Sequence, residues 1–287
     1  MKCKDFIVLK ALNHNALLCE AVQTKKQYVF FGKGIGFKKG EGDEFTYTDN
    51  VKESLLVLSS EESLQYNHLI NMVDNKKLVD LVQDLVYEAN KFFDGKVNAK
   101  LNLTLLDHLN FALERQKNKI VMNYPFLNEL QFIYPKEYKF SLKAFNYLND
   151  QLKGTAYFED AELGFLVLHI HAAITDTKVS KVLLNNEILY EATKIIEDSV
   201  DDHIDRKSIY YARFTKHLEY AIQRYKNGIQ LQNILLDNIK DTCKTEYEIA
   251  HRINSLLKRK YRIDLDENEI GYLTLHIYYL RNRKNQY

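Results

Sequence analysis

The stretch ELGFLVLHI at residues 162–170 recurs as EIGYLTLHI at residues 269–277, with Glu, Gly, an aromatic residue and His at the same offsets. A second stretch, DHLNFALER at residues 107–115, recurs as KHLEYAIQR at residues 216–224. Two unrelated phrases that repeat in one order and at nearly one spacing indicate a duplicated module of roughly 105 to 110 residues. Each copy of the module carries two histidines at matching positions.

Helical periodicity dominates the chain from residue 64 onward. The segment LVDLVQDLVYEANKFF at residues 78–93 places its apolar residues on one face, which predicts an amphipathic helix. Further helices are expected at residues 105–115, 140–152 and 161–174, and the second module repeats this pattern. The segment 123–138 holds both prolines of the chain and is expected to be a loop. Each module is therefore expected to form an all-α bundle.

The first sixty residues have a different character. Short runs rich in Val, Phe, Leu and Ile between Asp5 and Thr48 predict a small antiparallel sheet of about four strands. Such a small sheet buries little core alone, so it is expected to dimerise and cover its apolar face with a second copy. Residues 51–63 are expected to lead out of this domain, with a linker near 58–63. The expected architecture is an all-β N-terminal domain (1–60) followed by two all-α bundles (64–174 and 175–287).

Charge and composition narrow the function. Residues 1–40 carry eight lysines but only Asp5 and Glu20, a net charge of +6, whereas the whole chain has a net charge of +1. A basic first segment suggests an anionic partner. Three cysteines without CxxC spacing fit free thiols in a reducing cytosol. No apolar run reaches 18 residues and the N-terminus does not read as a signal peptide, so a cytoplasmic protein without membrane insertion is expected.

The glycine-rich stretch GKGIGFKKG at residues 32–40 does not match a nucleotide-binding loop. Phe37 stands where the dinucleotide fingerprint requires glycine, and no Gly-Lys-Ser/Thr follows. The stretch offers exposed backbone N–H groups, an aromatic ring for base stacking, and Lys33, Lys38 and Lys39 for phosphates. These features favour RNA binding, although a hairpin with solubilising lysines has the same composition.

The repeated histidines share helix faces with charged residues seven positions away, since seven residues make two turns. The matched sets are His108, Arg115, Glu162 and His169 in the first module and His217, Arg224, Glu269 and His276 in the second. A lone histidine on an amphipathic helix is usually structural. Two matched pairs, within phrases otherwise kept only by residue type, favour a function.

Three kinds of chemistry use such histidines. Metal binding is suggested by the His169-x-His171 pair, but that spacing suits a strand, and Tyr278 replaces the second histidine in the other module. Acid–base catalysis would need a nucleophile or substrate loop, and neither accompanies the pairs. Reversible phosphorylation would add charge and acceptor oxygens that a nearby arginine can bind.

Six phrases, taken in order, resemble the BglG/LicT-type transcriptional antiterminators of bacteria over essentially the whole chain. They are LKALNHNALL, FGKGIGFKKGEGD, LLDHLNFALER, ELGFLVLHIHAAIT, YARFTKHLEYAIQR and EIGYLTLHI. The resemblance is closest to the glucose-type members. It implies a dimerising co-antiterminator RNA-binding domain followed by two phosphotransferase-system (PTS) regulation domains, with no enzymatic activity and no cofactor. Such a protein binds a hairpin in the leader of a sugar-transport transcript and prevents the overlapping terminator from forming.

The resemblance also assigns residues and partners. RNA contacts are expected at Lys10, Asn15, Gly32, Lys33, Gly34 and Phe37, and phosphorylation at His108, His169, His217 and His276. The sugar-specific enzyme II is expected to inactivate the protein through the first regulation domain. In the family the phosphocarrier HPr often activates through the second, but glucose-type members need not use this input, which leaves the roles of His217 and His276 open. His14 departs from the family, which usually has asparagine there, so no direct RNA role is expected for it.

Two rival functions come from other classes. A DNA-binding activator could carry the same regulation domains, but it needs a helix-turn-helix where this chain has strand-like sequence. A histidine-rich helical metallohydrolase would contain metal in proportion to protein. We expect no metal-binding residues in this chain.

Overall fold

The computed structural model describes residues 4–47, 56–122, 124, 126–200 and 203–282. The chain divides into two compact units. The first unit comprises residues 1–124 and 136–179, and the second comprises residues 125–135 and 180–287. The boundaries expected from the repeats, 1–60, 64–174 and 175–287, stay a prediction.

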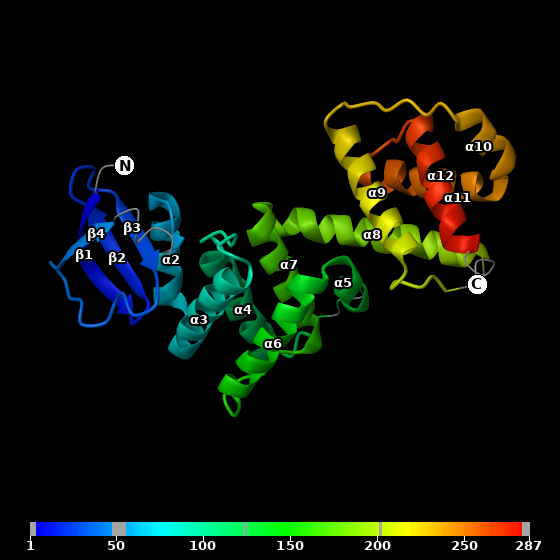
Figure 1. The fold of residues 1–287 in the computed structure, drawn as a ribbon. Helices are drawn as coiled ribbons and strands as arrows, with labels where there is room; N and C mark the ends of the chain where they lie inside the picture. Colours follow the sequence, from blue (N-terminus) through cyan, green and yellow to red (C-terminus); the bar gives the residue numbers. More distant parts are fainter. Residues whose placement is uncertain (1–3, 48–55, 123, 125, 201–202, 283–287) are drawn as a thin grey trace. The chain divides into compact units, whose positions relative to one another are not determined.

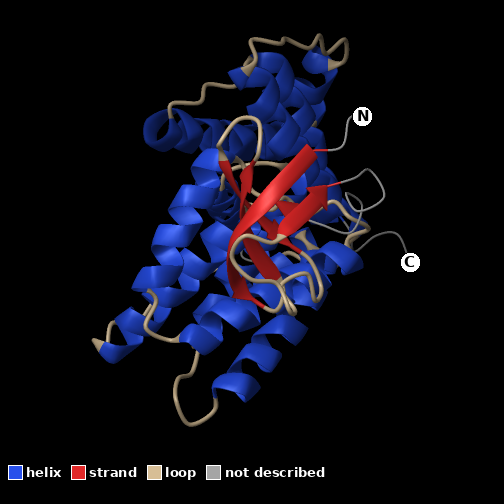
Figure 2. Ribbon diagram, turned by 90° about the vertical axis from the view of Figure 1, so that its left-hand side faces the viewer, coloured by secondary structure: helices blue, strands red, loops and turns tan. Residues whose placement is uncertain are grey.

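The N-terminal part of the first unit is one antiparallel sheet (Figures 1 and 2). Its strands are β1 (Lys4–Asn13), β2 (Ala16–Ala21), β3 (Gln27–Phe31), β4 (Glu44–Tyr47) and β5 (Leu56–Val57). The order across the sheet is β4-β1-β2-β3-β5, and each neighbouring pair is antiparallel. The predicted small antiparallel sheet is confirmed. It gains a fifth strand, because β5 pairs with β3 through Phe30 and Phe31.

Both faces of the sheet bury apolar side chains, because successive residues of a strand point to opposite faces and Phe30 and Phe31 of β3 are both buried. One face buries a cluster of five side chains: Phe6, Val8, Leu17, Cys19 and Phe30. The other face packs against helix α2 (Ser60–Met72), where the rings of Phe31 and Tyr66 meet edge to face at 5.2 Å. The Ser63 hydroxyl of α2 accepts a hydrogen bond from the Val29 amide at 2.8 Å. The chain therefore covers one face of its own sheet.

The prediction of a linker near residues 58–63 is wrong, because helix α2 starts within this segment. The Ser59 side chain accepts from the Glu62 amide, and the Glu62 carboxylate accepts from the Ser59 amide at 2.9 Å. This reciprocal capping satisfies two donors that a helix start leaves open. Leu58 and Ser63 are fully buried, as no linker would be. The part of the expected exit segment at residues 51–55 lies outside the described residues.

The rest of the first unit is helical (Figure 1). The helices after α2 are α3 (Lys76–Phe92), α4 (Leu101–Lys117), α6 (Pro135–Leu152) and α7 (Asp160–Thr175). The amphipathic pattern expected at residues 78–93 is α3, which buries Leu78, Leu81, Val82, Leu85, Val86 and Ala89. Phe92, expected on the same apolar face, is instead 42% exposed. Pro135 begins α6, where its missing N–H costs no helical hydrogen bond.

The second unit is also helical. Its elements are α5 (Leu127–Ile133), α8 (Val179–Val200), α9 (Ile209–Lys226), α10 (Leu236–Thr242), α11 (Lys244–Leu256), the π-helical turn η1 (Leu257–Tyr261) and α12 (Glu267–Arg281). The prediction of a loop at residues 123–138 is wrong, because this segment contains helix α5. Leu130 of α5 is fully buried, and the ring of Phe126 lies 4.7 Å from that of Tyr190 on α8. A helix of two turns has little stability alone and depends on such packing.

A sheet followed by two helical bundles is the predicted fold class, which is confirmed. No helix in the described ranges is long and apolar enough to cross a membrane.

Candidate functional site

The repeated phrases meet in pairs across two helix–helix contacts. In the first unit α4 packs against α7, and in the second α9 packs against α12. The first histidine cluster consists of His108, Arg115, Glu162 and His169, and the second histidine cluster consists of His217, Arg224, Glu269 and His276. Each cluster takes one histidine and its arginine from the earlier helix, and one histidine and its glutamate from the later helix.

Glu162 is the centre of the first histidine cluster. Its carboxylate contacts Nε2 of His108 and Nη2 of Arg115, both at 2.6 Å, and the residue is only 6% exposed. Burial alone would raise the pKa of Glu162, but its hydrogen bonds and the charges of His108 and Arg115 outweigh this and lower the pKa. Because an ionised carboxylate can only accept, His108 donates from Nε2–H. This hydrogen bond fixes the orientation of the His108 ring.

His169 lies beside His108, and no ion pair joins it to a residue in the described part of the chain. The two ring centroids are 5.0 Å apart, and His169 is 7% exposed. Burial and, to a smaller extent, the charge of the nearby His108 together lower the pKa of His169 to about 3. His169 is therefore neutral at physiological pH. Its Nδ1 has no hydrogen-bond partner among the described residues.

Both histidines of the first histidine cluster border a cavity of about 800 Å³. Other residues that line it include Asn98, Lys100, Thr104, Phe111 and Lys178. The cavity therefore leaves room for a small group next to the rings, with two lysines in its wall. A smaller cavity of about 220 Å³ in the second unit is lined by Glu269 but by neither histidine of its cluster.

The second histidine cluster repeats the arrangement with a different distribution of contacts. Arg224 binds both oxygens of Glu269, at 2.5 Å and 2.9 Å. His217 lies 3.5 Å from the same carboxylate, and its ring centroid is 4.6 Å from that of His276. Burial and, to a smaller extent, the charges of His276 and Arg224 together lower the pKa of His217 to about 3. His217 is thus neutral, and its approach to Glu269 is not an ion pair.

The glycine of the repeated phrase has a packing role. A Cβ built at Gly164 would lie 2.6 Å from the ring of Tyr124, and one at Gly271 would lie 2.7 Å from the Asn233 and Leu236 side chains. The ring of the next residue, Phe165, lies 5.0 Å from that of His108 in a tilted arrangement and contacts Tyr124 edge to face at 5.2 Å. The glycine therefore lets a loop pack closely against the helix that carries the glutamate and the histidine.

Adding one methyl group at Gly164 is expected to destabilise the protein. Gly164→Ala forces the Tyr124 ring away, and overpacking of this kind costs roughly 1–3 kcal/mol. Urea-induced unfolding of the full chain measures the change. Gly40→Ala is the matched control, because a Cβ there meets nothing within 4 Å, and its effect should stay within about 0.5 kcal/mol. Equal stability of the two variants would contradict the packing role.

The free energy of unfolding is expected to decrease as the pH is lowered, because the buried histidines are neutral in the folded protein. An unfolded chain binds a proton on His169 near its ordinary pKa of 6.5, whereas the folded pKa is about 3. The stabilisation is therefore complete above about pH 6.5 and is lost on acidification, by up to about 1.4 kcal/mol per pH unit for one histidine. Urea unfolding at pH 7.5 and 5.5 should show a smaller loss in His169→Gln than in the wild type. Equal losses would contradict the burial of a neutral ring.

Three of the residues expected to contact RNA, Asn15, Gly32 and Gly34, are joined at one end of the sheet. The backbone carbonyl of Asn15 accepts from the Gly32 amide at 2.9 Å, and its side-chain oxygen accepts from the Gly34 amide at 2.9 Å. Gly34 has a φ of 71°, which favours glycine. Asn15 thus joins the β1–β2 turn to the glycine-rich loop through two hydrogen bonds.

The glycine-rich loop presents Phe37 to solvent. Phe37 is 60% exposed, and the ammonium group of Lys38 lies 5.5 Å from its ring centroid. A Cβ at Gly36 would lie 2.0 Å from the backbone oxygen of Asn13, so only glycine fits against the β1–β2 turn. Lys10 on β1 and Lys33 in the glycine-rich loop are both exposed to solvent. The sequence did not single out Gly36 or Asn13, although their close approach fixes the loop.

Comparisons with known proteins agree with this arrangement. A model of the CAT RNA binding domain matches residues 6–63, and a model of the PRD domain matches residues 79–173 and again 190–280. The chain belongs to the BglG/LicT-type transcriptional antiterminators. Among similar proteins, Protein GlcT of Staphylococcus saprophyticus is 30% identical over 287 residues, which cover 98% of this chain and 99% of the relative. Protein GlcT of Staphylococcus aureus is 30% identical over 286 residues, again 98% and 99% of the two chains.

The antiterminator also resembles a solved structure, described as the crystal structure of GlcT CAT-PRDI. The two are 33% identical, the match covers 60% of this chain and 99% of the other, and the TM-score is 0.48. The family matches show an RNA-binding antiterminator of the GlcT type that is regulated by PTS phosphorylation. The rival functions, a DNA-binding activator and a metallohydrolase, are not favoured.

The remaining histidine of the HxH pair has a different role in this antiterminator. His171 Nδ1 contacts the Glu137 carboxylate of α6 at 2.9 Å, while His169 faces His108 on α4. Burial raises the pKa of Glu137, but the hydrogen bond and charge of His171 lower it overall. Among the residues that the structure describes, no three His, Cys, Asp or Glu side chains are placed to hold a metal ion.

Proposed function

We propose that this antiterminator is a cytoplasmic switch in which the four histidines of the two histidine clusters accept phosphoryl groups and thereby control RNA binding. The observation that carries the proposal is the position of Glu162, a buried carboxylate that bridges a histidine and an arginine across the α4–α7 contact. A phosphoryl group on either ring would enter next to this carboxylate. The contact between the two helices would then have to change.

The size of the effect supports a switch. Two unit charges 4 Å apart repel by about 4 kcal/mol at the effective dielectric constant of partly buried sites. A hydrogen bond to a charged group contributes only about 1.5–3 kcal/mol. A phosphorylated ring therefore repels Glu162 more strongly than the His108 contact holds it. Arg115 can exchange the carboxylate for phosphate oxygens, which it binds with similar geometry. Phosphorylation thus replaces one helix–helix contact by another.

The phosphoryl donors follow from the family. We propose the sugar-specific enzyme II as the donor that inactivates through the first module and HPr as a donor for the second. The cavity beside His108 and His169 supports direct transfer to the first histidine cluster, since the reacting ring must be reached by a donor. In the second unit, burial and Arg213 lower the pKa of His276, so a neutral nucleophilic ring is available there too.

The output is RNA binding by a dimer of the N-terminal sheet. We propose that Lys10, Asn15, Gly32, Lys33, Gly34 and Phe37 contact a leader-mRNA hairpin. The exposed Phe37 ring can stack on an unpaired base, and the loop amides and lysines can bind phosphates. Because the proposed RNA site is formed by two N-terminal sheets, any shift between monomer and dimer changes the affinity for RNA.

A gel-shift experiment tests the RNA-binding function. The full chain should retard a leader hairpin with internal loops and should not retard a hairpin of scrambled sequence. Identical behaviour of the two hairpins would contradict the proposed specificity.

A further inference from the structure

Two carboxylates of α3 hold the end of the sheet that carries the RNA-contact residues. The Asn15 amide Nδ2 donates to Asp84 Oδ1 at 3.1 Å, and the Asn13 amide Nδ2 donates to Asp80 Oδ1. Asp80 and Asp84 are four residues apart and therefore lie on one face of α3, with Glu88 one further turn along. We call Asp80, Asp84 and Glu88 the α3 acidic face.

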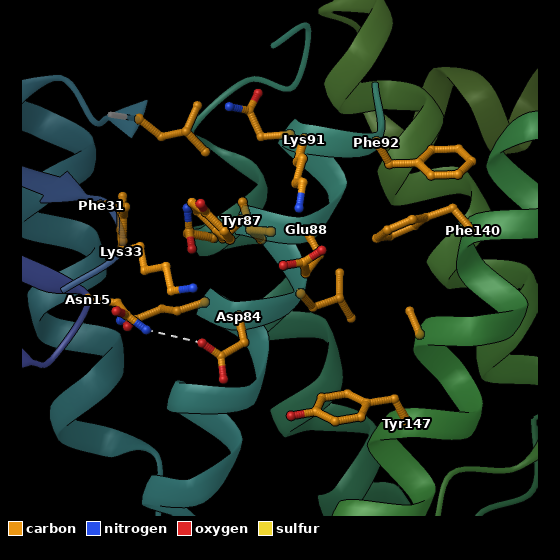
Figure 3. Close-up of a pocket in the computed structure, with 18 of the residues that line it drawn as sticks. Asn15, Phe31, Lys33, Asp84, Tyr87, Glu88, Lys91, Phe92, Phe140 and Tyr147 are labelled. Atoms are coloured by element: carbon orange, nitrogen blue, oxygen red, sulfur yellow. Dashed lines mark hydrogen bonds between the residues drawn. The ribbon is translucent and has the colours of Figure 1, made fainter. Parts of the chain in front are cut away.

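Two members of the α3 acidic face, Asp84 and Glu88, line a cavity of about 800 Å³ together with three of the residues expected to contact RNA (Figure 3). Asn15, Gly32 and Lys33 form its wall on the side of the sheet, and Asp84 and Glu88 form part of the wall on α3. Figure 3 shows the hydrogen bond between Asn15 and Asp84 that joins the two walls. The groups expected to meet RNA thus face carboxylates of the same chain.

The spacing of these carboxylates needs an explanation. Like charges at i and i+4 destabilise a helix by a few tenths of a kcal/mol for each pair. Burial raises the pKa of Asp84, and Asp80 raises it further, while the hydrogen bond from Asn15 lowers it. An ionised carboxylate offers only acceptors, as a phosphate group does. Amide donors that suit phosphate oxygens therefore suit the α3 acidic face as well.

We propose that the α3 acidic face is an internal competitor for RNA: Asp80 and Asp84 occupy the amide donors of Asn13 and Asn15, and RNA must displace these two carboxylates to bind. This inference rests on the proposed RNA-contact residues and goes beyond them by naming their partner in the absence of RNA. Helix α3 packs against α4, which carries His108 and Arg115. A shift of α4 at the first histidine cluster can therefore move α3 relative to the sheet.

The test is the RNA affinity of the full chain with the double substitution Asp80→Ala and Asp84→Ala. Loss of two charge-assisted contacts should tighten binding of the leader hairpin by about tenfold or more. The control is Asp74→Ala with Asp150→Ala, which removes the same charge from exposed positions of the same unit. The control should leave the affinity within about twofold of the wild type, because distant surface charges are screened.

Salt separates displacement from simple repulsion. General repulsion of RNA by Asp80 and Asp84 would disappear at high salt, whereas competition for the asparagine donors would persist. A gain in affinity that survives high salt supports the competitor. An unchanged affinity, or a gain that vanishes with salt, overturns it. If neither the wild type nor the variant retards the hairpin, the RNA-binding function itself fails, and the competitor fails with it.

Discussion

Replacement of all four histidines of the two histidine clusters by glutamine is expected to reduce the acid-labile phosphate on the chain to background. The wild type is incubated with phosphoenolpyruvate, enzyme I, HPr and enzyme II, and the phosphate bound per chain is measured. Glutamine keeps the polarity of the buried positions but has no ring nitrogen that can form a phosphoramidate. The expected change is therefore complete, not graded.

Two further variants make this result specific. His171→Gln and His251→Gln alter histidines that lie outside the clusters, since His171 contacts Glu137 and His251 lies on α11. Both should take up as much phosphate as the wild type. Persistent phosphate in the fourfold variant would contradict the assignment of the sites. Circular dichroism establishes that the variant is folded, and phosphopeptide mapping of the wild type gives the modified residues independently.

Loss of the Phe37 ring is expected to weaken RNA binding by about 5- to 150-fold. Stacking of a base on an aromatic side chain contributes roughly 1–3 kcal/mol, and Phe37→Ala removes it. The ring is exposed, so the substitution should leave the free energy of unfolding nearly unchanged. Filter binding or fluorescence anisotropy with the leader hairpin measures the affinity.

A matched pair of lysines distinguishes the site from general charge. Lys33→Ala should weaken binding and reduce the salt dependence of the affinity by about one counterion. Lys26 is exposed in the turn before β3, at a position outside the expected contacts, and Lys26→Ala should change the affinity little. Equal effects of Lys26 and Lys33, together with unchanged binding by Phe37→Ala, would place the RNA elsewhere on the protein.

Periodicity was sufficient to predict how each cluster assembles. Residues seven apart on a helix share a face, so the repeated phrases paired Glu162 with His169, and His108 with Arg115. The structure brings these four residues together between α4 and α7, and their counterparts between α9 and α12. The small sheet was also predictable, because its apolar strand segments are separated by clear turn residues.

What periodicity missed depends on contacts between distant segments. Helix α5 forms because Leu130 is buried in the second unit, and nothing in its seven residues requires a helix. The start of α2 could have been found, since Ser59 and Glu62 have the spacing of a capping box. The Asn15–Asp84 contact joins residues 69 positions apart and has no local signal. The repeated phrases also do not predict that Glu162 contacts both a histidine and an arginine, whereas both oxygens of Glu269 bind the arginine.

One measurement tests the central claim most directly: the RNA affinity of the full chain before and after phosphorylation by enzyme II and its donors. A change of about 1.4 kcal/mol is tenfold in affinity, and repulsion of about 4 kcal/mol at Glu162 is large enough to produce it. We expect the phosphorylated wild type to bind the leader hairpin at least about tenfold more weakly, and the fourfold glutamine variant to bind equally well with and without the donors. An unchanged affinity of a wild type that carries stoichiometric phosphate on His108 or His169 would contradict the account.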